Sequence, residues 1–286
     1  MLDSSTCIIE AIILGIIQGF TEFLPISSSA HLMLLPKLAN FPYFGKTFDV
    51  ILHGGTLLAI CFYKWDLLKR MLASFYKYGC ACWKRKKIVS WHGYGSSDLK
   101  LALLTVVATV PTAILGFALE NTIEKFFHGL LFTAATLGIF GFLLYKADRK
   151  GGRNVELGAI SIKEAAGIGV AQALALFPGV SRSGVVLTAA RLLNIPRLEA
   201  GTISLVTALP VVGGAFFVKM LRILGTSEPF EPSFIFVSAS GFLASFIAGL
   251  IGIMLLEKIV SHYTLKPFAI YRVSLALLLL VMWVVA

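Results

Sequence analysis

The chain has 286 residues, of which 57% are hydrophobic and 14% charged, and its mean hydropathy is +0.86. A soluble domain of this size could not cover so much apolar surface, so the composition excludes a disordered chain, a nucleic-acid reader and an ordinary cytosolic enzyme. The net charge of +10 fits the habit of membrane proteins of keeping Lys and Arg in cytoplasmic loops. The sequence therefore predicts an all-α, polytopic integral membrane protein in which residues 1–286 form one domain.

Six stretches are apolar and long enough to cross about 30 Å of hydrocarbon as helices. Two further stretches, 8–41 and 164–193, are equally apolar but are interrupted halfway by Pro, Gly and Ser. Such an interruption predicts two short helices joined by a break rather than one continuous span. The six predicted transmembrane helices cover residues 48–64, 99–119, 129–146, 200–220, 232–256 and 267–286.

Basic residues predict which connections face the cytoplasm. Residues 64–100 and 146–163 together hold 14 of the 25 Lys and Arg, so we expect cytoplasmic loops at about 65–98 and 147–163. The acidic connection at 120–128 then falls outside, and counting back places the N-terminus outside as well. This count closes only if each interrupted stretch is re-entrant, the first dipping in from outside and the second from the cytoplasm.

An internal repeat relates the two interrupted stretches. At an offset of 154 residues, seven of the 20 positions in residues 10–29 are identical to those in residues 164–183. Three spans separate the copies, an odd number, so inverted repeats at about 8–146 and 164–286 are expected. Coincidence between two apolar helices rich in small residues is the alternative. In inverted repeats with broken helices the site lies near the membrane midplane, where the two breaks meet.

The first break brings ionisable and hydroxyl side chains to membrane depth. Gln18 and Glu22 are four residues apart and share a helix face, and Ser28 and His31, three apart, share a face after the break. Intramembrane ionisable residues are costly and usually functional. The alternatives are a structural carboxyl at Glu22, a packed imidazole at His31 and, for any one of the serines, a simple helix cap.

The second break reads Pro-Gly-Val-Ser-Arg-Ser-Gly and carries one arginine, Arg182, at membrane depth. Backbone N–H groups in a Gly/Ser turn that opens a helix form an anion nest, and arginine adds a bidentate fork for phosphate. The pattern therefore predicts a phosphate or pyrophosphate ligand. A buried ion pair between Arg182 and Glu22 is the structural alternative. The other residues expected to bind the anion are Gly179, Ser181, Ser183, Gly184 and, from the first break, Ser27.

Two other polar pairs lie within the predicted spans. Asp49 and His53, four residues apart, either face the same cavity or lie at the membrane interface. Tyr271 and Arg272 lie near the cytoplasmic end of the last span, where we expect the arginine to snorkel to the surface.

The two breaks resemble the signature motifs of the bacterial undecaprenyl-pyrophosphate phosphatases of the bacitracin-resistance type. That family has an (E/Q)-x-x-x-E motif followed by Pro, a Ser pair and His, and a second motif of the form PGxSRSxxT. Residues 18–31 fit the first motif and residues 178–183 fit the second. The closing Thr of the second motif is Val186 here, so no hydroxyl contact is assigned at that position.

The resemblance implies hydrolysis of undecaprenyl pyrophosphate to the monophosphate and phosphate, which recycles the lipid carrier of peptidoglycan synthesis and confers bacitracin resistance. It also implies a location in the bacterial inner membrane, with the site open to the periplasm. A divalent cation, Mg²⁺ or Ca²⁺, is a further family feature. Glu22 would position the cation with help from Gln18, which cannot supply the charge that a glutamate supplies in many relatives.

The implied catalytic roles follow the same residues. Ser28 is the candidate nucleophile, with Ser27 or a water molecule as the alternatives. His31 would act as general base or as proton donor to the leaving group. Arg182 would hold the pyrophosphate and stabilise charge on the transferred phosphoryl group.

A transporter is the main alternative, because inverted repeats with broken helices are also a transporter design. Such a chain would carry or flip a lipid phosphate or another anion. A carrier needs only the anion site, whereas a phosphatase also needs a nucleophile or base, so Ser28 and His31 favour the enzyme. The expected partners are the polyprenyl pyrophosphate lipid and the membrane, with no nucleic acid, and a homo-oligomer is left open.

Overall fold

The computed structural model places eleven α-helices and no strand in the residues that it describes, which confirms the all-α prediction there. Those residues are 4–42, 44–85, 96–127, 129–152, 155, 159–225 and 231–285. The helices are α1 (Ser4–Phe23), α2 (Ser28–Ala39), α3 (Lys46–Tyr63), α4 (Trp65–Arg85), α5 (Ser97–Phe126), α6 (Leu130–Lys150), α7 (Ile162–Ala173), α8 (Arg182–Leu192), α9 (Arg197–Leu224), α10 (Pro232–His262) and α11 (Lys266–Val285), with a short 3-10 helix η3 (Leu174–Leu176) after α7.

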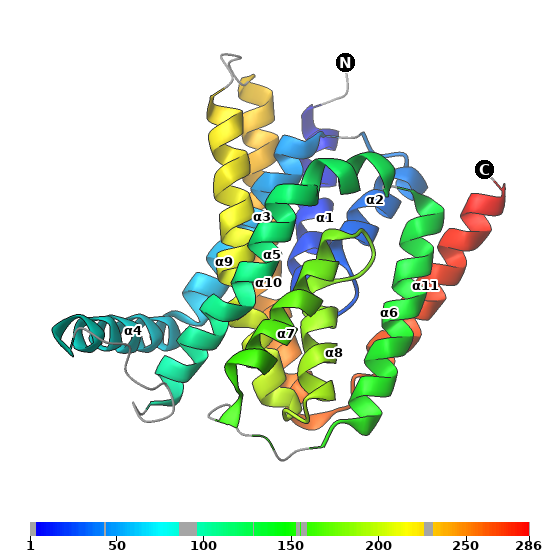
Figure 1. Cartoon of the computed structure of the whole chain (residues 1–286). Helices are drawn as coiled ribbons and strands as arrows, with labels where there is room; N and C mark the ends of the chain where they lie inside the picture. Colours follow the sequence, from blue (N-terminus) through cyan, green and yellow to red (C-terminus); the bar gives the residue numbers. More distant parts are fainter. Residues whose placement is uncertain are drawn as a thin grey trace.

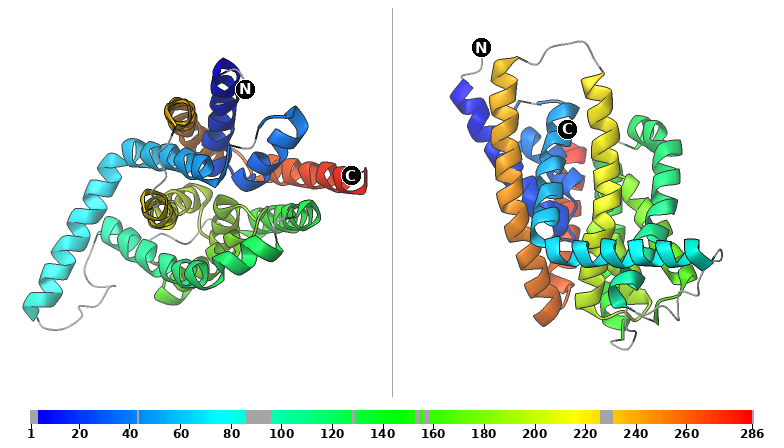
Figure 2. Two further views of the ribbon diagram at one scale, coloured as in Figure 1. Left: turned by 90° about the horizontal axis from the view of Figure 1, so that it is seen from above. Right: turned by 90° about the vertical axis from the view of Figure 1, so that its left-hand side faces the viewer.

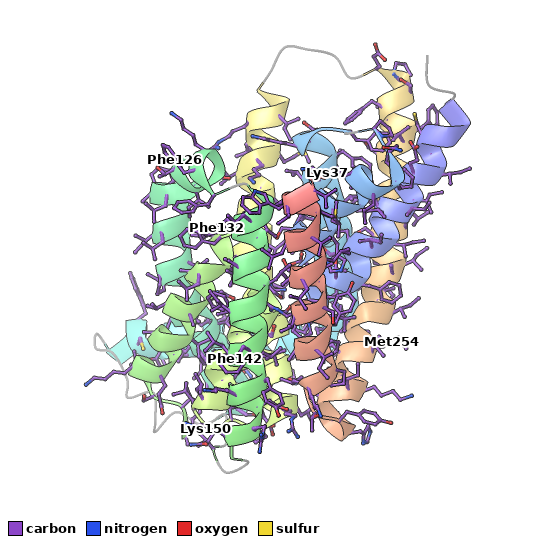
Figure 3. The ribbon with its side chains drawn as sticks, turned by 90° about the vertical axis from the view of Figure 1, so that its right-hand side faces the viewer. Lys37, Phe126, Phe132, Phe142, Lys150 and Met254 are labelled. Atoms are coloured by element: carbon purple, nitrogen blue, oxygen red, sulfur yellow. The ribbon has the colours of Figure 1, made fainter. Side chains whose placement is uncertain are left out.

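Five of the six predicted spans are long and apolar enough to cross a membrane, namely those in α5, α6, α9, α10 and α11. Apolar side chains such as Phe142 and Met254 cover the outer surface of these helices (Figure 3). The sixth prediction coincides with α3, which has 18 residues but contains Lys46, Asp49 and His53. These polar residues keep its hydropathy low, so its crossing remains a prediction. The chain is a multi-pass membrane protein.

The prediction of a loop at 65–98 is wrong for its first part, because Trp65–Arg85 form α4. The many basic residues suggested a loop, but apolar residues recur at helical spacing between them. Leu67, Leu68 and Met71 pack against the main core. Figure 2 shows α4 lying across the long helices rather than along them. Residues 86–95 of the predicted loop lie outside the described residues.

Both interrupted stretches form two helices joined by a break, as predicted. The first break separates α1 from α2, and the second separates α7 and η3 from α8. In Figure 1 the two breaks lie in the middle of the molecule. The α1–α2 pair reaches its break from the end that holds both chain termini, whereas the α7–α8 pair reaches its break from the opposite end.

The internal repeat is visible in the backbone. Four non-glycine residues in the described part of the chain have a positive φ: Ser27 (76°), Asn40 (53°), Ser181 (67°) and Asn194 (60°). They form two pairs at the offset of 154 residues that the sequence identity shows. In each pair of helices, the serine precedes the second helix and the asparagine follows it. Positive φ is costly for serine, so both breaks hold a strained residue at the same position.

Glycines at equivalent positions let the first helix of each pair pack closely against a long neighbour. A Cβ at Gly15 would overlap the carbonyl of Gly241 on α10, and a Cβ at Gly169 would overlap the carbonyl of Ala108 on α5. Small residues allow such close backbone approach in membrane helices. This packing fixes α1 and α7, and therefore the breaks that follow them.

Candidate active site

The two breaks are joined directly by hydrogen bonds. The hydroxyl of Ser183 donates to the carbonyl of Leu24 at 3.1 Å, and the backbone N–H of Gly179 donates to Ser29 Oγ at 3.4 Å. Ser183 is almost fully buried, so its hydroxyl is committed to holding the breaks together. These bonds bring residues about 150 positions apart to one place.

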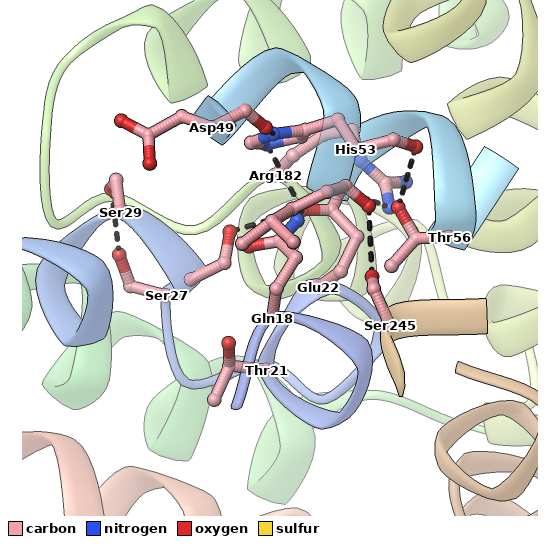
Figure 4. A network of polar contacts seen from close by, with 12 residues as sticks. Gln18, Thr21, Glu22, Ser27, Ser29, Asp49, His53, Thr56, Arg182 and Ser245 are labelled. Carbon is pink, nitrogen blue, oxygen red and sulfur yellow. Dashed lines mark hydrogen bonds and ion pairs between the residues drawn. The ribbon is translucent and has the colours of Figure 1, made fainter. Parts of the chain in front are cut away.

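Glu22 is the centre of the polar cluster at this junction (Figure 4). Its Oε2 accepts hydrogen bonds from Gln18 Nε2 at 3.1 Å and from Ser28 Oγ at 3.0 Å. Its Oε1 faces Arg182 Nη2 at 3.4 Å, so the buried ion pair given above as the structural alternative is present. The structure therefore brings three of the predicted site residues onto the buried carboxylate of a fourth.

The cluster contains buried polar atoms that have no hydrogen-bond partner in the described part of the chain. Arg182 Nη1 donates to the carbonyl of Ser204 at 2.7 Å, but Arg182 Nε has no acceptor. The hydroxyl of Ser204 and the amide oxygen of Gln18 are also unsatisfied. Buried polar groups are normally hydrogen-bonded, and three exceptions on Glu22's partners Gln18 and Arg182 and on Ser204, which contacts Arg182, make this cluster a candidate ligand site. Ser204 lies on α9, and no motif in the sequence pointed to it.

His53 lines the same carboxylate from α3. Its Nε2 lies 3.7 Å from Glu22 Oε2, and its Nδ1 lies 2.8 Å from the backbone carbonyl of Asp49. A carbonyl only accepts, so Nδ1 carries a hydrogen there. The imidazole is about a third exposed, whereas Glu22 is buried, so His53 lies on the solvent-accessible side of the cluster. Of the two readings of the Asp49 and His53 pair, the structure favours the shared site for His53.

His31 lies beside the cluster but does not point into it. Its Nδ1 is 2.7 Å from the carbonyl of Ser27, and its Nε2 is 2.6 Å from the hydroxyl of Tyr271. The two rings are stacked with an interplanar angle of 2°. His31 and Ser28 both follow the first break, as predicted, but Ser28 bonds to Glu22 whereas His31 bonds to α11.

The prediction that Arg272 snorkels to the surface is wrong, because this side chain is fully buried beneath the two breaks. Its Nη2 donates to the carbonyls of Gly179 and Val180 at 3.0 and 2.8 Å, and its Nη1 donates to the carbonyl of Pro25 at 3.4 Å. A helix break leaves carbonyls without helical partners, and the guanidinium satisfies several at once. Gly184 makes room for it, since a Cβ there would lie 2.5 Å from Arg272 Nη1.

The remaining predicted anion-binding residues shape the backbone of the breaks. Ser181 Oγ caps α8 by accepting from the N–H of Gly184 at 3.1 Å, so this N–H of the expected nest is already used. Ser27 precedes α2 without a side-chain cap, and its hydroxyl instead lies 3.2 Å from Ser29 Oγ. Gly179 has φ of 87°, which glycine adopts freely.

Comparison with known proteins agrees with these motifs. Residues 11–278 match the family described as bacitracin resistance protein BacA. The undecaprenyl-diphosphatase of Geotalea daltonii is 41% identical over 274 residues, which are 95% of this chain and 97% of that protein. The proteins of the same name from Geobacter sulfurreducens and Thermomicrobium roseum are 41% identical over 266 residues (93% and 94% of the two chains) and 36% identical over 279 residues (95% and 96%). This chain therefore belongs to the bacitracin resistance protein BacA family.

Proposed function

We propose that this chain hydrolyses undecaprenyl pyrophosphate to undecaprenyl phosphate and inorganic phosphate at the junction of the two breaks. One observation carries the proposal: one carboxylate oxygen of Glu22 accepts a hydrogen bond from the hydroxyl of Ser28, and the other pairs with Arg182. A nucleophile, a base and an anion clamp are thus adjacent. The three relatives are named as diphosphatases, and nothing supports the transporter alternative.

Arg182 is suited to hold the pyrophosphate. It is already oriented by the Ser204 carbonyl, and its unsatisfied Nε leaves one edge of the guanidinium available for a phosphate oxygen. The ion pair with Glu22 keeps the guanidinium in place before the substrate binds. A fixed cation at the transferred phosphoryl group stabilises the charge that builds up in the transition state.

Glu22 is suited to move the protons. It accepts the proton of Ser28 while Ser28 Oγ bonds to the terminal phosphorus, and it passes that proton to the departing undecaprenyl phosphate. In the second half, Glu22 takes a proton from a water molecule whose oxygen bonds to the same phosphorus. The bond from phosphorus to Ser28 breaks, phosphate leaves, and Glu22 returns the proton to Ser28. In the alternative without a covalent step, Glu22 activates water directly.

The donors around Glu22 suit the divalent cation that the family resemblance implies. Gln18 offers an unsatisfied amide oxygen next to the carboxylate of Glu22. No group of three His, Cys, Asp or Glu that could hold a metal ion occurs among the described residues, and Mg²⁺ often takes its other ligands from water and substrate phosphates. We propose Glu22 and Gln18 as the protein ligands. When bound, the cation would neutralise charge on the phosphate oxygens.

We further propose six membrane spans, with α3 as the sixth, and two re-entrant pairs, α1–α2 and α7–α8, related as inverted repeats. The shared offset of the strained residues and the opposite approach of the two pairs support this arrangement. Because the basic ends of α6 and α11 lie opposite the termini (Figure 1), the termini would face the periplasm of a bacterial inner membrane. His53 on α3 would then open the site toward that side.

The decisive experiment measures phosphate release from undecaprenyl pyrophosphate by the purified protein in detergent, with and without Mg²⁺ or Ca²⁺. We expect release by the wild type and loss of release in Arg182→Ala. Arg149→Ala is the matched control, because Arg149 is an exposed arginine at the end of α6. Full activity of Arg182→Ala would remove the anion clamp, and an inactive, folded wild type supplied with cation would reject the phosphatase and call for a flux assay in liposomes.

The cation sites are tested by titrating activity against Mg²⁺ in Glu22→Gln. We expect any residual activity to require much more cation, because the carboxylate that is bonded to Gln18 has lost its charge. Glu10→Gln is the control, since it makes the same change in the same helix three turns away. An unchanged titration midpoint in Glu22→Gln would argue against ligation by Glu22.

A further inference from the structure

Helix α4 carries an apolar stripe that no part of the described chain covers. The positions of the stripe are seven, four and seven residues apart, which places them within about 20° of one line along a helix. All four side chains are between 57% and 86% exposed, and three are aromatic. They are Trp65, Leu72, Tyr76 and Trp83.

A basic row runs along another face of the helix. Arg70, Lys77 and Lys84 are seven residues apart and are shifted from the stripe by roughly a third of a turn. Arg70 is paired with Asp98 at 3.3 Å, so Lys77 and Lys84 are the members of the row that could bind a headgroup. The third face, with Leu67 and Met71, packs against the bundle. Over its length α4 has five basic residues against one acidic residue. The helix therefore presents one face to the protein, one largely apolar face bordered by Lys69, and a face that is cationic in the second half of the helix.

The position of α4 suits a membrane surface. It follows α3 directly and lies across the long helices, in the half of the bundle away from the N-terminus (Figure 2). The second repeat has no equivalent, because α9 ends at Leu224 and α10 already begins at Pro232. The repeat architecture thus does not require α4, and its exposed faces need a separate explanation.

We infer that α4 is an interfacial helix whose apolar stripe inserts into the adjacent lipid leaflet and whose basic row binds anionic lipid headgroups. Aromatic and basic residues on separate faces of a helix are the pattern of helices that lie in the membrane interface. The positive row is complementary to the phosphate of an anionic lipid. That attraction decays over about one Debye length, so the row must lie close to the headgroups. The inference rests on the proposed membrane arrangement but not on the chemistry of the site.

Fluorescence quenching by brominated lipids tests the insertion. The chain has four tryptophans, and replacing three with Phe leaves Trp83 as the reporter. A second version that keeps only Trp283, in the last predicted span, is the positive reference. In vesicles of phosphatidylcholine and phosphatidylglycerol, we expect lipids brominated on the acyl chains to quench Trp83 about twofold or more, because the apolar face of an interfacial helix reaches the start of the acyl chains. Quenching of Trp283 without quenching of Trp83 would overturn the insertion.

The headgroup preference is tested by placing the bromine on only one lipid of the mixture. We expect stronger quenching of Trp83 by brominated phosphatidylglycerol than by brominated phosphatidylcholine, and loss of that difference in Lys77→Glu/Lys84→Glu. The control is Lys146→Glu/Lys150→Glu, which makes the same charge change on exposed lysines of α6. Equal quenching by both lipids in the wild type would overturn the headgroup binding. Concentration-dependent self-association with an unquenched Trp83 would assign the stripe to a second copy instead.

Discussion

The hydroxyl of Tyr271 lies 2.6 Å from His31 Nε2 and fixes the orientation of that imidazole. The other ring nitrogen, Nδ1, lies 2.7 Å from the carbonyl of Ser27, which only accepts hydrogen bonds. Nδ1 therefore carries the hydrogen, and Nε2 of the neutral ring accepts from Tyr271. His31 is thus tied to the strained residue of the first break on one side and to α11 on the other.

Tyr271→Phe removes the donor to Nε2 and leaves the ring shape unchanged. We expect kcat for phosphate release to fall about tenfold with little change in KM, since one hydrogen bond of about 1.4 kcal/mol is lost from a positioning contact. Tyr263→Phe is the control, because it removes the hydroxyl of an exposed tyrosine after α10. If both variants kept full kcat, the contact between Tyr271 and His31 would have no role in turnover.

Arg272 is expected to matter for stability before catalysis. Replacing it by Met leaves the carbonyls of Gly179 and Val180 without donors, at a cost of about 1–3 kcal/mol for each buried group. We expect a lower midpoint of thermal unfolding in detergent, with Arg272→Lys between Met and the wild type because lysine lacks the planar fork. Arg222→Lys, at an exposed position of α9, should leave the midpoint unchanged.

An undiminished unfolding midpoint in Arg272→Met would show that the carbonyls of the two breaks find other donors. In that case the geometry of the breaks does not depend on α11. The activity of the same variant separates the two roles, because a folded but inactive protein would assign Arg272 to the chemistry of the site.

The choice of nucleophile can be tested between neighbouring serines. Ser28 donates to Glu22, whereas Ser27 is buried and its hydroxyl lies beside Ser29. We expect Ser28→Ala to lower kcat by roughly a thousandfold or more, as loss of a nucleophile does, and Ser27→Ala to have a smaller effect. Acid quenching during turnover should trap phosphoserine at position 28 in the wild type. Near-normal turnover in Ser28→Ala would favour direct attack by water.

The local parts of this site could be predicted from the sequence. Spacing of four residues places Gln18 and Glu22 on one helix face, and Pro, Gly and Ser mark both breaks. The offset of 154 residues also relates the breaks to each other, and the same offset reappears in the positive φ values of Ser27 and Ser181. These features depend on contacts within one helix or on similarity between two segments, which a single sequence displays directly.

The contacts between distant elements could not be predicted. Tyr271 is 240 residues from His31, and Ser204 reaches Arg182 only because α9 packs beside α8. An arginine near the end of a span usually snorkels, so Arg272 gave no sign that helix breaks would supply its acceptors. The basic residues of α4 likewise led to the prediction of a loop where a helix forms, because charge indicates the side of the membrane and not the secondary structure.

Two glycines give a matched test of how tightly the second break is built. Gly179 has φ of 87°, and a Cβ there would overlap Thr136 Oγ1, which donates to the carbonyl of Pro178 at 2.6 Å. Gly179→Ala should therefore lower stability by about 2–4 kcal/mol, combining backbone strain with a displaced Thr136. Gly167 lies on an open face of α7, so Gly167→Ala should raise stability by up to about 1 kcal/mol.

Thermal unfolding of both alanine variants in the same detergent measures the difference. Because the hydrogen bond between Thr136 and Pro178 joins α6 to the break, we also expect Gly179→Ala to lose phosphatase activity at temperatures where the protein is still folded. Gly167→Ala should keep that activity. Equal unfolding midpoints for the two variants would mean that the second break can accommodate a side chain at Gly179. The tight packing around Gly179 would then not be what holds Arg182 in place.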